Sequence, residues 1–484
     1  MIEYKNLFHK LRKSSLILNL SSIVSCRIIN VLIGLITFGY AARVLGAEMY
    51  GLVGFGASIV AYAGIVTLPG ITIWGTRSVA TDKQNIGKTL LIVNSTILLM
   101  TCFAYAGLVF FSLTLNNPME KKIVLLSGIS LFSTALSLEW VFNGLEQMRI
   151  PAYLSIIQTS LFTITLISLV KSPADVYIFP LLMPGASLIV VIISYVIFLK
   201  KSASTYVLPK FPDYKKALRA AIALGIMASM VTILHFANNL IVNAYLGLLS
   251  LGVFWAAFKL IEQISAIPAI LGSIFYARLA RFVIDDKEKA KMQAIIFAQI
   301  NMITGFFVAA YLVAEANEII RLIYGSKYLD SVRILQIMAV AVIFNFAIHG
   351  YTNCLIPFRK DHILILVVII ETIVSVAGGI ICVSYFGLIG AAFAVAFIDF
   401  AGWLVSLPAY KKIIGDVQIH LWIKPMLGFL CMIGTLLGLQ YLGAPVYFRL
   451  PVSVIIYVIF IKEDLKNIMS LLAGSSLQYN LKRT

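Results

Sequence analysis

Hydrophobic residues fill this chain in long runs that short polar segments interrupt. A helix needs about 20 apolar residues to cross the hydrocarbon core of a bilayer. The pattern therefore predicts an all-α, polytopic membrane protein with about fourteen transmembrane helices. These spans are expected near residues 16–41, 50–72, 89–112, 122–144, 151–170, 176–199, 219–245, 250–277, 292–313, 332–356, 362–383, 388–409, 424–441 and 446–461.

Composition supports the same class of protein. Of the 484 residues, 61% are hydrophobic and only 12% are charged, and a soluble protein cannot bury that much apolar surface. The first apolar run, Leu16 to Ala42, is longer than the roughly 7–15 residue core of a secretory signal, so it is expected to remain as a span. The connections are short and leave no room for a soluble domain between spans.

Lysine and arginine are distributed unevenly between alternate connections. If the N-terminus is cytoplasmic, 28 of the 38 basic residues lie on the cytoplasmic side, 8 lie on the other side, and Arg27 and Lys259 lie within spans. The positive-inside rule then predicts that both termini are cytoplasmic. Attraction of these residues to the anionic inner leaflet accounts for the net charge of +17, so nucleic acid is not expected as a partner.

An internal repeat predicts two pseudo-symmetric six-helix lobes. Residues 1–199 form the expected N-terminal lobe, 200–218 a basic cytoplasmic linker, 219–410 the C-terminal lobe, and 411–484 an extra helix pair with a cytoplasmic tail. At an offset of 201 positions, Gly46 aligns with Gly247 and Gly51 with Gly252, each in the first hairpin of its lobe. Because each lobe has an even number of spans, the lobes share one orientation in the membrane.

The first of these hairpins has the sequence YAARVLGAEMYGLVGFG, residues 40 to 56. Gly46 is expected to reverse the chain and Gly51 to allow close approach of backbones, since glycine has no Cβ. Arg43 and Glu48 are then expected in a short loop at the membrane–water interface on the outer side.

Polar and charged residues inside the spans are the candidates for function, because a charge at mid-bilayer costs about 2.5–3.5 kcal/mol or more. Arg27 lies on one face of span 1 together with Asn30 and other polar residues. That face predicts either the wall of an aqueous cavity or a polar seam against another helix. In span 8, Lys259 and Glu262 are three residues apart and therefore neighbours. They form either a self-neutralising pair or part of a binding wall.

Other polar and charged residues suggest three further roles. Span 7 carries a polar stripe that could line the same cavity, in which a lone histidine is either a structural group or a proton relay. The cytoplasmic ends of spans 2 and 8 carry arginines that are either topology signals or an entrance for an anionic headgroup. Buried acids could couple transport to an ion or pair with cations. The residues are His235 and Asn239 for the stripe, Arg77 and Arg278 for the entrance, and Glu139, Glu371 and Asp399 for ion coupling.

No cofactor or metal is expected. The five cysteines show no paired spacing, which argues against disulfides and metal sites, and no phosphate-binding loop of the G-x-x-x-x-G-K-[ST] type occurs. Transport, if that is the activity, would then draw on the substrate gradient or on a coupled ion.

Three segments resemble a known family. FGYAARVLGAEMYGLVGFGASIVAY (38–62), EIIRLIYGSKYLDSVRILQIMAV (318–340) and YFGLIGAAFAVAF (385–397) are similar to segments of polysaccharide flippases, the Wzx-like O-antigen transporters. This family is part of the multidrug/oligosaccharidyl-lipid/polysaccharide exporter superfamily, which also holds lipid II flippases and drug–cation antiporters. The resemblance covers roughly residues 14 to 410.

The resemblance implies a fold and a function. Such proteins have two six-helix lobes in a V shape around a cavity walled by spans 1, 2, 7 and 8. They are not enzymes; in lipopolysaccharide biosynthesis they move an undecaprenyl-pyrophosphate-linked oligosaccharide across the bacterial cytoplasmic (inner) membrane, beside a polysaccharide polymerase and a chain-length regulator. Cationic cavity residues meet the pyrophosphate, a role that Arg27 and, more loosely, Lys259 match here.

Two other functions stay open. A drug–cation antiporter of the same fold should favour an anionic cavity, whereas the first hairpins here carry arginines. A membrane polysaccharide polymerase or ligase should carry a sizeable outer loop with catalytic groups, whereas the largest outer connection here, around residues 315–333, is small.

Overall fold

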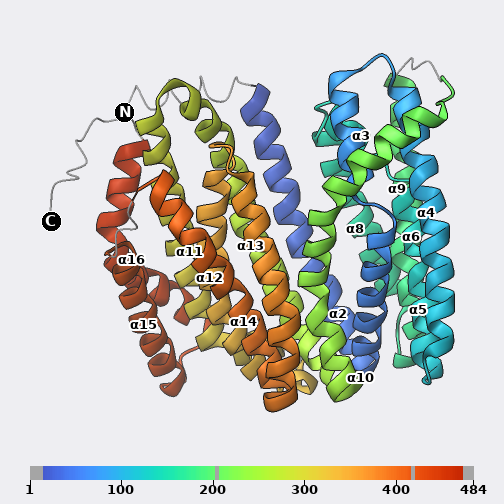
Figure 1. The fold of residues 1–484 in the computed structure, drawn as a ribbon. Helices are drawn as coiled ribbons and strands as arrows, with labels where there is room; N and C mark the ends of the chain where they lie inside the picture. The colour runs from blue at the N-terminus through green and yellow to red at the C-terminus, as the bar shows by residue number, and fades with distance from the viewer. Residues whose placement is uncertain (1–14, 202–206, 416–419, 473–484) are drawn as a thin grey trace. The chain divides into compact units, whose positions relative to one another are not determined.

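The computed structural model describes residues 15–201, 207–415 and 420–472, and within these ranges the chain is helical with no β-strand. In chain order the elements are α2 (Ser15–Val66), α3 (Gly70–Thr81), α4 (Ile86–Thr114), α5 (Pro118–Gly128), α6 (Ser130–Ala135), α7 (Glu139–Gly144), α8 (Arg149–Leu169), the 3-10 turn η1 (Pro173–Tyr177), α9 (Phe179–Lys201), α10 (Phe211–Asp285), α11 (Lys287–Ile323), the 3-10 turn η2 (Ser326–Tyr328), α12 (Ser331–Leu355), α13 (Asp361–Ile373), the π-turn η3 (Val374–Gly378), α14 (Gly379–Ile413), α15 (His420–Tyr441) and α16 (Val446–Leu472). Figure 1 shows these helices.

Ten stretches among the described residues are long and apolar enough to cross a membrane. Three of them contain two spans each, because α2, α10 and α14 are interrupted at Gly46, Gly247 and Gly387, which have positive φ. The final predicted span lies within α16, which is not one of the ten. The predicted class, an all-α polytopic membrane protein with about fourteen spans, is confirmed.

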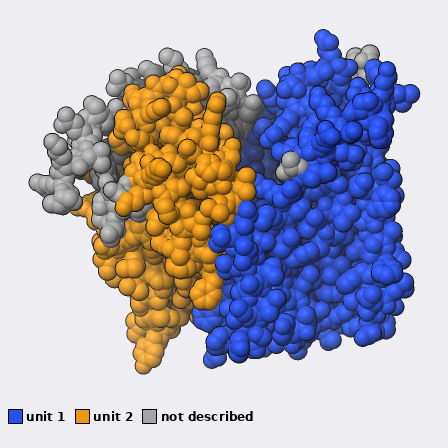
Figure 2. Space-filling model, viewed as in Figure 1, with its two compact units in different colours: residues 1–263, 320–334, 368–395 blue, residues 264–319, 335–367, 396–484 orange. Residues whose placement is uncertain are grey.

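The molecule divides into two compact units, coloured separately in Figure 2. Unit 1 holds residues 1–263, 320–334 and 368–395, and unit 2 holds residues 264–319, 335–367 and 396–484. The division cuts α10, α11 and α14, so it differs from the boundaries of the predicted lobes, which stay a prediction.

In unit 1, α2 packs on α8, α5 and α4, α8 packs on α9, and α3 packs on α7 and α4 (Figure 1). The first turns of α10 belong to the same core, since Ala217 and Ala221 are fully buried in a cluster with Ile71, Val93 and Phe142. Helix α10 already begins at Phe211, so the second half of the predicted linker is helical.

In unit 2, the two C-terminal helices α15 and α16 pack together and against α11 in one hydrophobic core. Arg449 of α16 forms a buried ion pair with Glu315 of α11, with 3.0 Å between Nη1 and Oε2. The Tyr457 hydroxyl also donates to the Ile303 carbonyl at 2.7 Å. The helix pair that the sequence adds to the twelve spans is therefore fastened to α11 by polar contacts as well as by apolar burial.

Candidate substrate-binding region

Helices α2 and α10 are each interrupted at a glycine, Gly46 in α2 and Gly247 in α10. Gly46 has φ 75° and ψ 169°, and Gly247 has φ 79° and ψ 178°, a backbone region open essentially to glycine alone. These are the two glycines that the 201-residue offset aligned, and the two hairpins therefore reverse with the same local geometry. The predicted role of Gly46 in reversing the chain is confirmed.

The hairpins also touch each other reciprocally. A Cβ added to Gly51 would lie 2.0 Å from the Leu248 carbonyl oxygen, and one added to Gly252 would lie 1.7 Å from the Ala47 carbonyl oxygen. The offset that relates Gly51 to Gly252 also relates Ala47 to Leu248, so the contact repeats under exchange of the two hairpins. The predicted close approach at Gly51 is confirmed, and its partner is the second hairpin.

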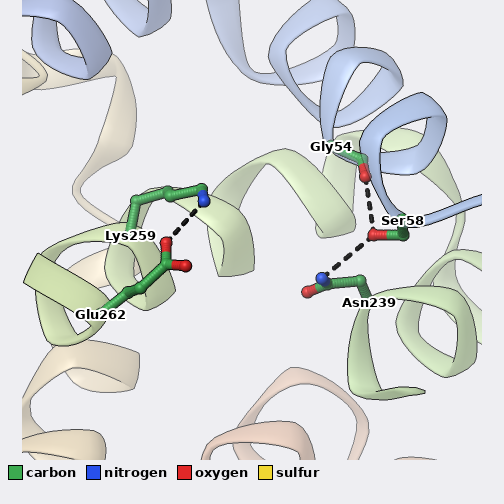
Figure 3. A network of polar contacts seen from close by, with 5 residues as sticks. All are labelled: Gly54, Ser58, Asn239, Lys259 and Glu262. Carbon is green, nitrogen blue, oxygen red and sulfur yellow. Dashed lines mark hydrogen bonds and ion pairs between the residues drawn. The ribbon is translucent and has the colours of Figure 1, made fainter. Parts of the chain in front are cut away.

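A polar contact between the same two helices lies further along α2 and α10. Asn239 of α10 is fully buried and donates from Nδ2 to the Ser58 hydroxyl of α2 at 3.1 Å. The Ser58 hydroxyl in turn donates to the Gly54 carbonyl at 2.8 Å (Figure 3). The Asn239 Oδ1 atom has no hydrogen-bond partner among the described residues. This buried amide oxygen can accept a hydrogen bond from a bound hydroxyl group or water.

Lys259 lies on α10 with its charge surrounded by three groups. Its ammonium is 2.5 Å from Glu262 Oε2, 4.4 Å from the ring centroid of Trp255 and 5.2 Å from that of Phe38. The Lys259 side chain is 13% exposed and that of Glu262 35% exposed. The contact expected from the spacing of Lys259 and Glu262 is confirmed, and Figure 3 draws this pair together with Ser58 and Asn239.

The polar face of the first span is divided between two neighbours. Asn30 donates to the Ser155 hydroxyl at 2.8 Å, and Thr37 shares a hydrogen bond of 2.6 Å with Thr163, so both contact α8. Gly34 lies against Gln263 of α10, because an added Cβ would lie 3.2 Å from the Gln263 Oε1 atom. This face is thus partly a seam against α8, the alternative that the sequence left open.

Arg27 lies on α2 with an exposed side chain and no ion-pair partner among the described residues. His235 is also exposed, and its Nδ1 atom lies 2.9 Å from the Val231 carbonyl of its own helix. Of the two entrance candidates, Arg77 is exposed at the end of α3, while Arg278 lies in α10 and its side chain is outside the described part.

The three acidic candidates lie apart from the Lys259 pair in the chain. Glu139 is exposed at the start of α7, and Glu371 of α13 is buried at 8% exposure with a polar partner. Asp399 of α14, in unit 2, accepts a hydrogen bond of 3.2 Å from Asn345. Their role in ion coupling stays a prediction.

Sequence reasoning missed Ser58 and Phe38 as neighbours of the candidate residues. Both lie on the N-terminal helix α2, whereas the residues that they contact are on α10. A pattern along one helix shows which residues share a face, but not which helix packs there.

A family model described as polysaccharide biosynthesis protein matches residues 16–279, more than half of the chain. This chain belongs to that polysaccharide biosynthesis family. The match includes both kinked hairpins, the Ser58–Asn239 contact and the Lys259–Glu262 pair.

Alignments with two related proteins are longer than the stretch that the family model matches. The chain is 24% identical, over 389 residues, to a protein assigned as an O-antigen transporter in Shigella dysenteriae, and the match covers 79% of this chain and 96% of that protein. It is 23% identical, over 319 residues, to a protein with the same assignment in Escherichia coli K12, covering 64% of this chain and 76% of that protein.

Two solved structures show which fold this family member has. The structure of "Lipid II flippase MurJ, inward closed conformation" is similar with a TM-score of 0.74 and 14% identity, covering 94% of this chain and 100% of that chain. An inward-facing multidrug resistance MATE family transporter has a TM-score of 0.60 and 14% identity, covering 83% and 99%. The chain therefore has a transporter fold.

Proposed function

We propose that this protein is a flippase that translocates undecaprenyl-pyrophosphate-linked repeat units, of O-antigen or another polysaccharide, across the bacterial cytoplasmic membrane. The observation that carries the proposal is the Lys259 ammonium, held within a membrane-spanning helix of a polysaccharide biosynthesis family member. A mid-membrane cation suits an anionic headgroup, whereas a cation exporter gains nothing from it. The relatives assigned as O-antigen transporters support this substrate class over a drug–cation antiporter.

Transport of this substrate meets one main barrier, which is dragging a charged, hydrated headgroup through hydrocarbon. Polar groups on α2 and α10 would lower that barrier by replacing water around the pyrophosphate and sugars. Lys259 contributes a charge, and Arg27 contributes an exposed guanidinium whose planar fork can bind two phosphate oxygens. The lipid tail can stay in the bilayer, since only the headgroup needs a polar path.

Glu262 sets how the Lys259 charge becomes available. In this structure Glu262 neutralises Lys259 at 2.5 Å. An arriving pyrophosphate would compete with Glu262 for the ammonium, and the pair would re-form when the headgroup leaves. The partly exposed carboxylate thus allows release as well as binding. Asn30, His235 and Asn239 are proposed as further polar contacts to the sugars or phosphates.

The mechanism is alternating access, in which two lobes rock so that the polar region opens first to one side and then to the other. With both termini in the cytoplasm, the Gly46 and Gly247 hairpins face outward, and Arg77 and Arg278 lie at the cytoplasmic entrance. Glu139, Glu371 and Asp399 are candidates for a coupled ion. A polysaccharide polymerase and a chain-length regulator are the proposed functional partners.

The proposal is tested in a strain from which the gene is deleted. The strain should lose surface polysaccharide and accumulate lipid-linked repeat units on the inner leaflet, and the wild-type gene should restore export. Lys259→Ala and Arg27→Ala should each lower the export rate about tenfold or more, since a charge-assisted contact is worth about 1.5–3 kcal/mol.

The matched control is Lys83→Ala, because Lys83 is an exposed lysine in the connection between α3 and α4. This variant should export normally, and all variants should be compared at equal abundance in the membrane. Unchanged surface polysaccharide in the deletion strain would refute the proposed function. Normal export by Lys259→Ala would refute only the role of Lys259.

A further inference from the structure

Residues 320–334 run from the last turn of α11, through η2, into the first turn of α12, and this segment contacts both kinked hairpins. On the first hairpin, the Tyr328 hydroxyl donates to the Ala42 carbonyl at 3.0 Å, and the Tyr328 ring meets that of Tyr50 edge-on with centroids 6.4 Å apart. On the second hairpin, the Ser331 hydroxyl donates to the Val253 carbonyl at 2.7 Å. Because Tyr328 and Ser331 are fully buried, water does not replace these bonds in this state.

Arg43 of the first hairpin adds a contact from a charged side chain to this segment. Its Nε atom donates to the Ile323 carbonyl at 2.9 Å, and Nη2 donates to the carbonyls of Arg321, at 3.3 Å, and of Leu322. These are the last carbonyls of α11, which ends at Ile323. A helix leaves its last carbonyls without intrahelical donors and with a partial negative charge, so a guanidinium is a favourable cap.

The backbones themselves are close at the same place. A Cβ added to Gly39 would lie 2.8 Å from the Ile323 carbonyl oxygen. The two hairpins meanwhile touch directly through Gly51 and Gly252. The segment of residues 320–334 therefore lies against two hairpins that are themselves in contact, and it is hydrogen-bonded to each.

We propose that residues 320–334 form a strap that holds the two hairpins together at this end, with Arg43 as its catch. Separating the hairpins requires that the strap release either Val253 on one side or Ala42 and the Arg43 side chain on the other. Arg43 is the part best suited to reversible release, because its side chain is exposed and its guanidinium can exchange carbonyls for water. The inference rests on the proposed alternating-access function, in which this end opens to discharge the headgroup.

The strap is tested by the accessibility of a buried reporter. Ser58→Cys places a thiol at a fully buried position seven residues beyond Gly51 on α2, about 10 Å deeper along the helix. It is introduced into a full-length chain whose five native cysteines are replaced by serine. A membrane-impermeant maleimide is then added to intact spheroplasts, and the initial labelling rate is measured.

Arg43→Gln should raise the labelling rate about tenfold, since hydrogen bonds to a charged group are lost. Arg43→Lys, which keeps the charge but not the fork, should give an intermediate rate. Tyr328→Phe and Ser331→Ala remove one hydroxyl each and should raise the rate severalfold. The matched control is Glu48→Gln, which removes an exposed charge from the same hairpin and should leave the rate unchanged.

The outcomes separate the strap from the proposed function. Unchanged labelling in Arg43→Gln, Tyr328→Phe and Ser331→Ala would overturn the strap, and the two hydroxyl variants decide if Arg43→Gln fails to reach the membrane. Faster labelling only in inside-out vesicles would support the strap but overturn the proposed orientation. The labelling and export results can also disagree. If the strap variants label faster in spheroplasts but the deletion strain still exports polysaccharide normally, the strap is supported and the proposed function is overturned.

Discussion

At the scale of single residues, Lys259 shows how a cation is kept inside a membrane-spanning helix. A lone lysine at mid-bilayer costs about 2.5–3.5 kcal/mol or more. Glu262 at 2.5 Å offsets the charge, and the face of Trp255 at 4.4 Å adds a cation–π attraction. The pair is therefore coupled, since removing either partner leaves the other charge uncompensated in a mostly buried site.

This coupling predicts the result of a double-mutant cycle. Glu262→Gln alone and Lys259→Gln alone should each lower the free energy of unfolding by about 1–3 kcal/mol, while the double variant should lose less than the sum. Thermal unfolding in detergent can be followed with a thiol-reactive dye, because Cys26 and Cys354 are buried in the folded chain. Additive losses would contradict the coupling.

At the scale of elements, the contact between α2 and α10 depends on glycine at two equivalent positions. Gly51 and Gly252 each face a backbone carbonyl at a distance that no Cβ can occupy. A carbonyl cannot swing aside as a flexible side chain does, so a methyl group there must push the helices apart.

Gly51→Ala and Gly252→Ala should therefore destabilise the protein by similar amounts, about 1–3 kcal/mol each. The matched control is Gly107→Ala in α4, where an added Cβ meets nothing within 4 Å. The control should be neutral or slightly stabilising, because alanine loses less backbone entropy in a helix. The same thermal unfolding assay compares the three variants. A loss in Gly107→Ala as large as in Gly252→Ala would show that the effect is not steric.

At the scale of the whole molecule, the segment that joins the two predicted lobes is held to the first lobe. The first turn of α10 makes polar contacts with α4. Asp213, in the first turn of α10, forms an ion pair of 2.8 Å with Lys88 of α4. Nearby, the hydroxyls of Ser95 and Tyr214 are 3.1 Å apart. The hydrogen bond from Lys88, followed by that from the Lys210 backbone, lowers the pKa of Asp213 from its ordinary value.

A lowered pKa in the folded state makes this contact sensitive to acid. The stabilisation is present above the ordinary pKa of an aspartate and is lost as the pH falls through the lowered pKa, that is, below about pH 4. At neutral pH the wild type should have a higher melting temperature than Asp213→Asn. This difference should shrink below about pH 4. Helical circular dichroism measured against temperature tests this. A difference that is constant over the whole pH range would exclude the proposed linkage.

The sequence alone predicted the spans, the paired glycines and the Lys259–Glu262 contact. Hydrocarbon thickness sets the length of a span, glycine has a unique backbone range, and a three-residue spacing places two side chains together on any helix. These are local or solvent-imposed constraints, so they can be read along the chain.

Only the tertiary structure decided the partners across helices. It placed Ser58 beside Asn239, Asn30 against Ser155, and Arg43 on the end of α11. A polar stripe on one helix is equally compatible with a wet cavity and with a seam, because the energetics of a polar group depend on what faces it. That choice is made by packing between segments far apart in the chain, which no periodicity records.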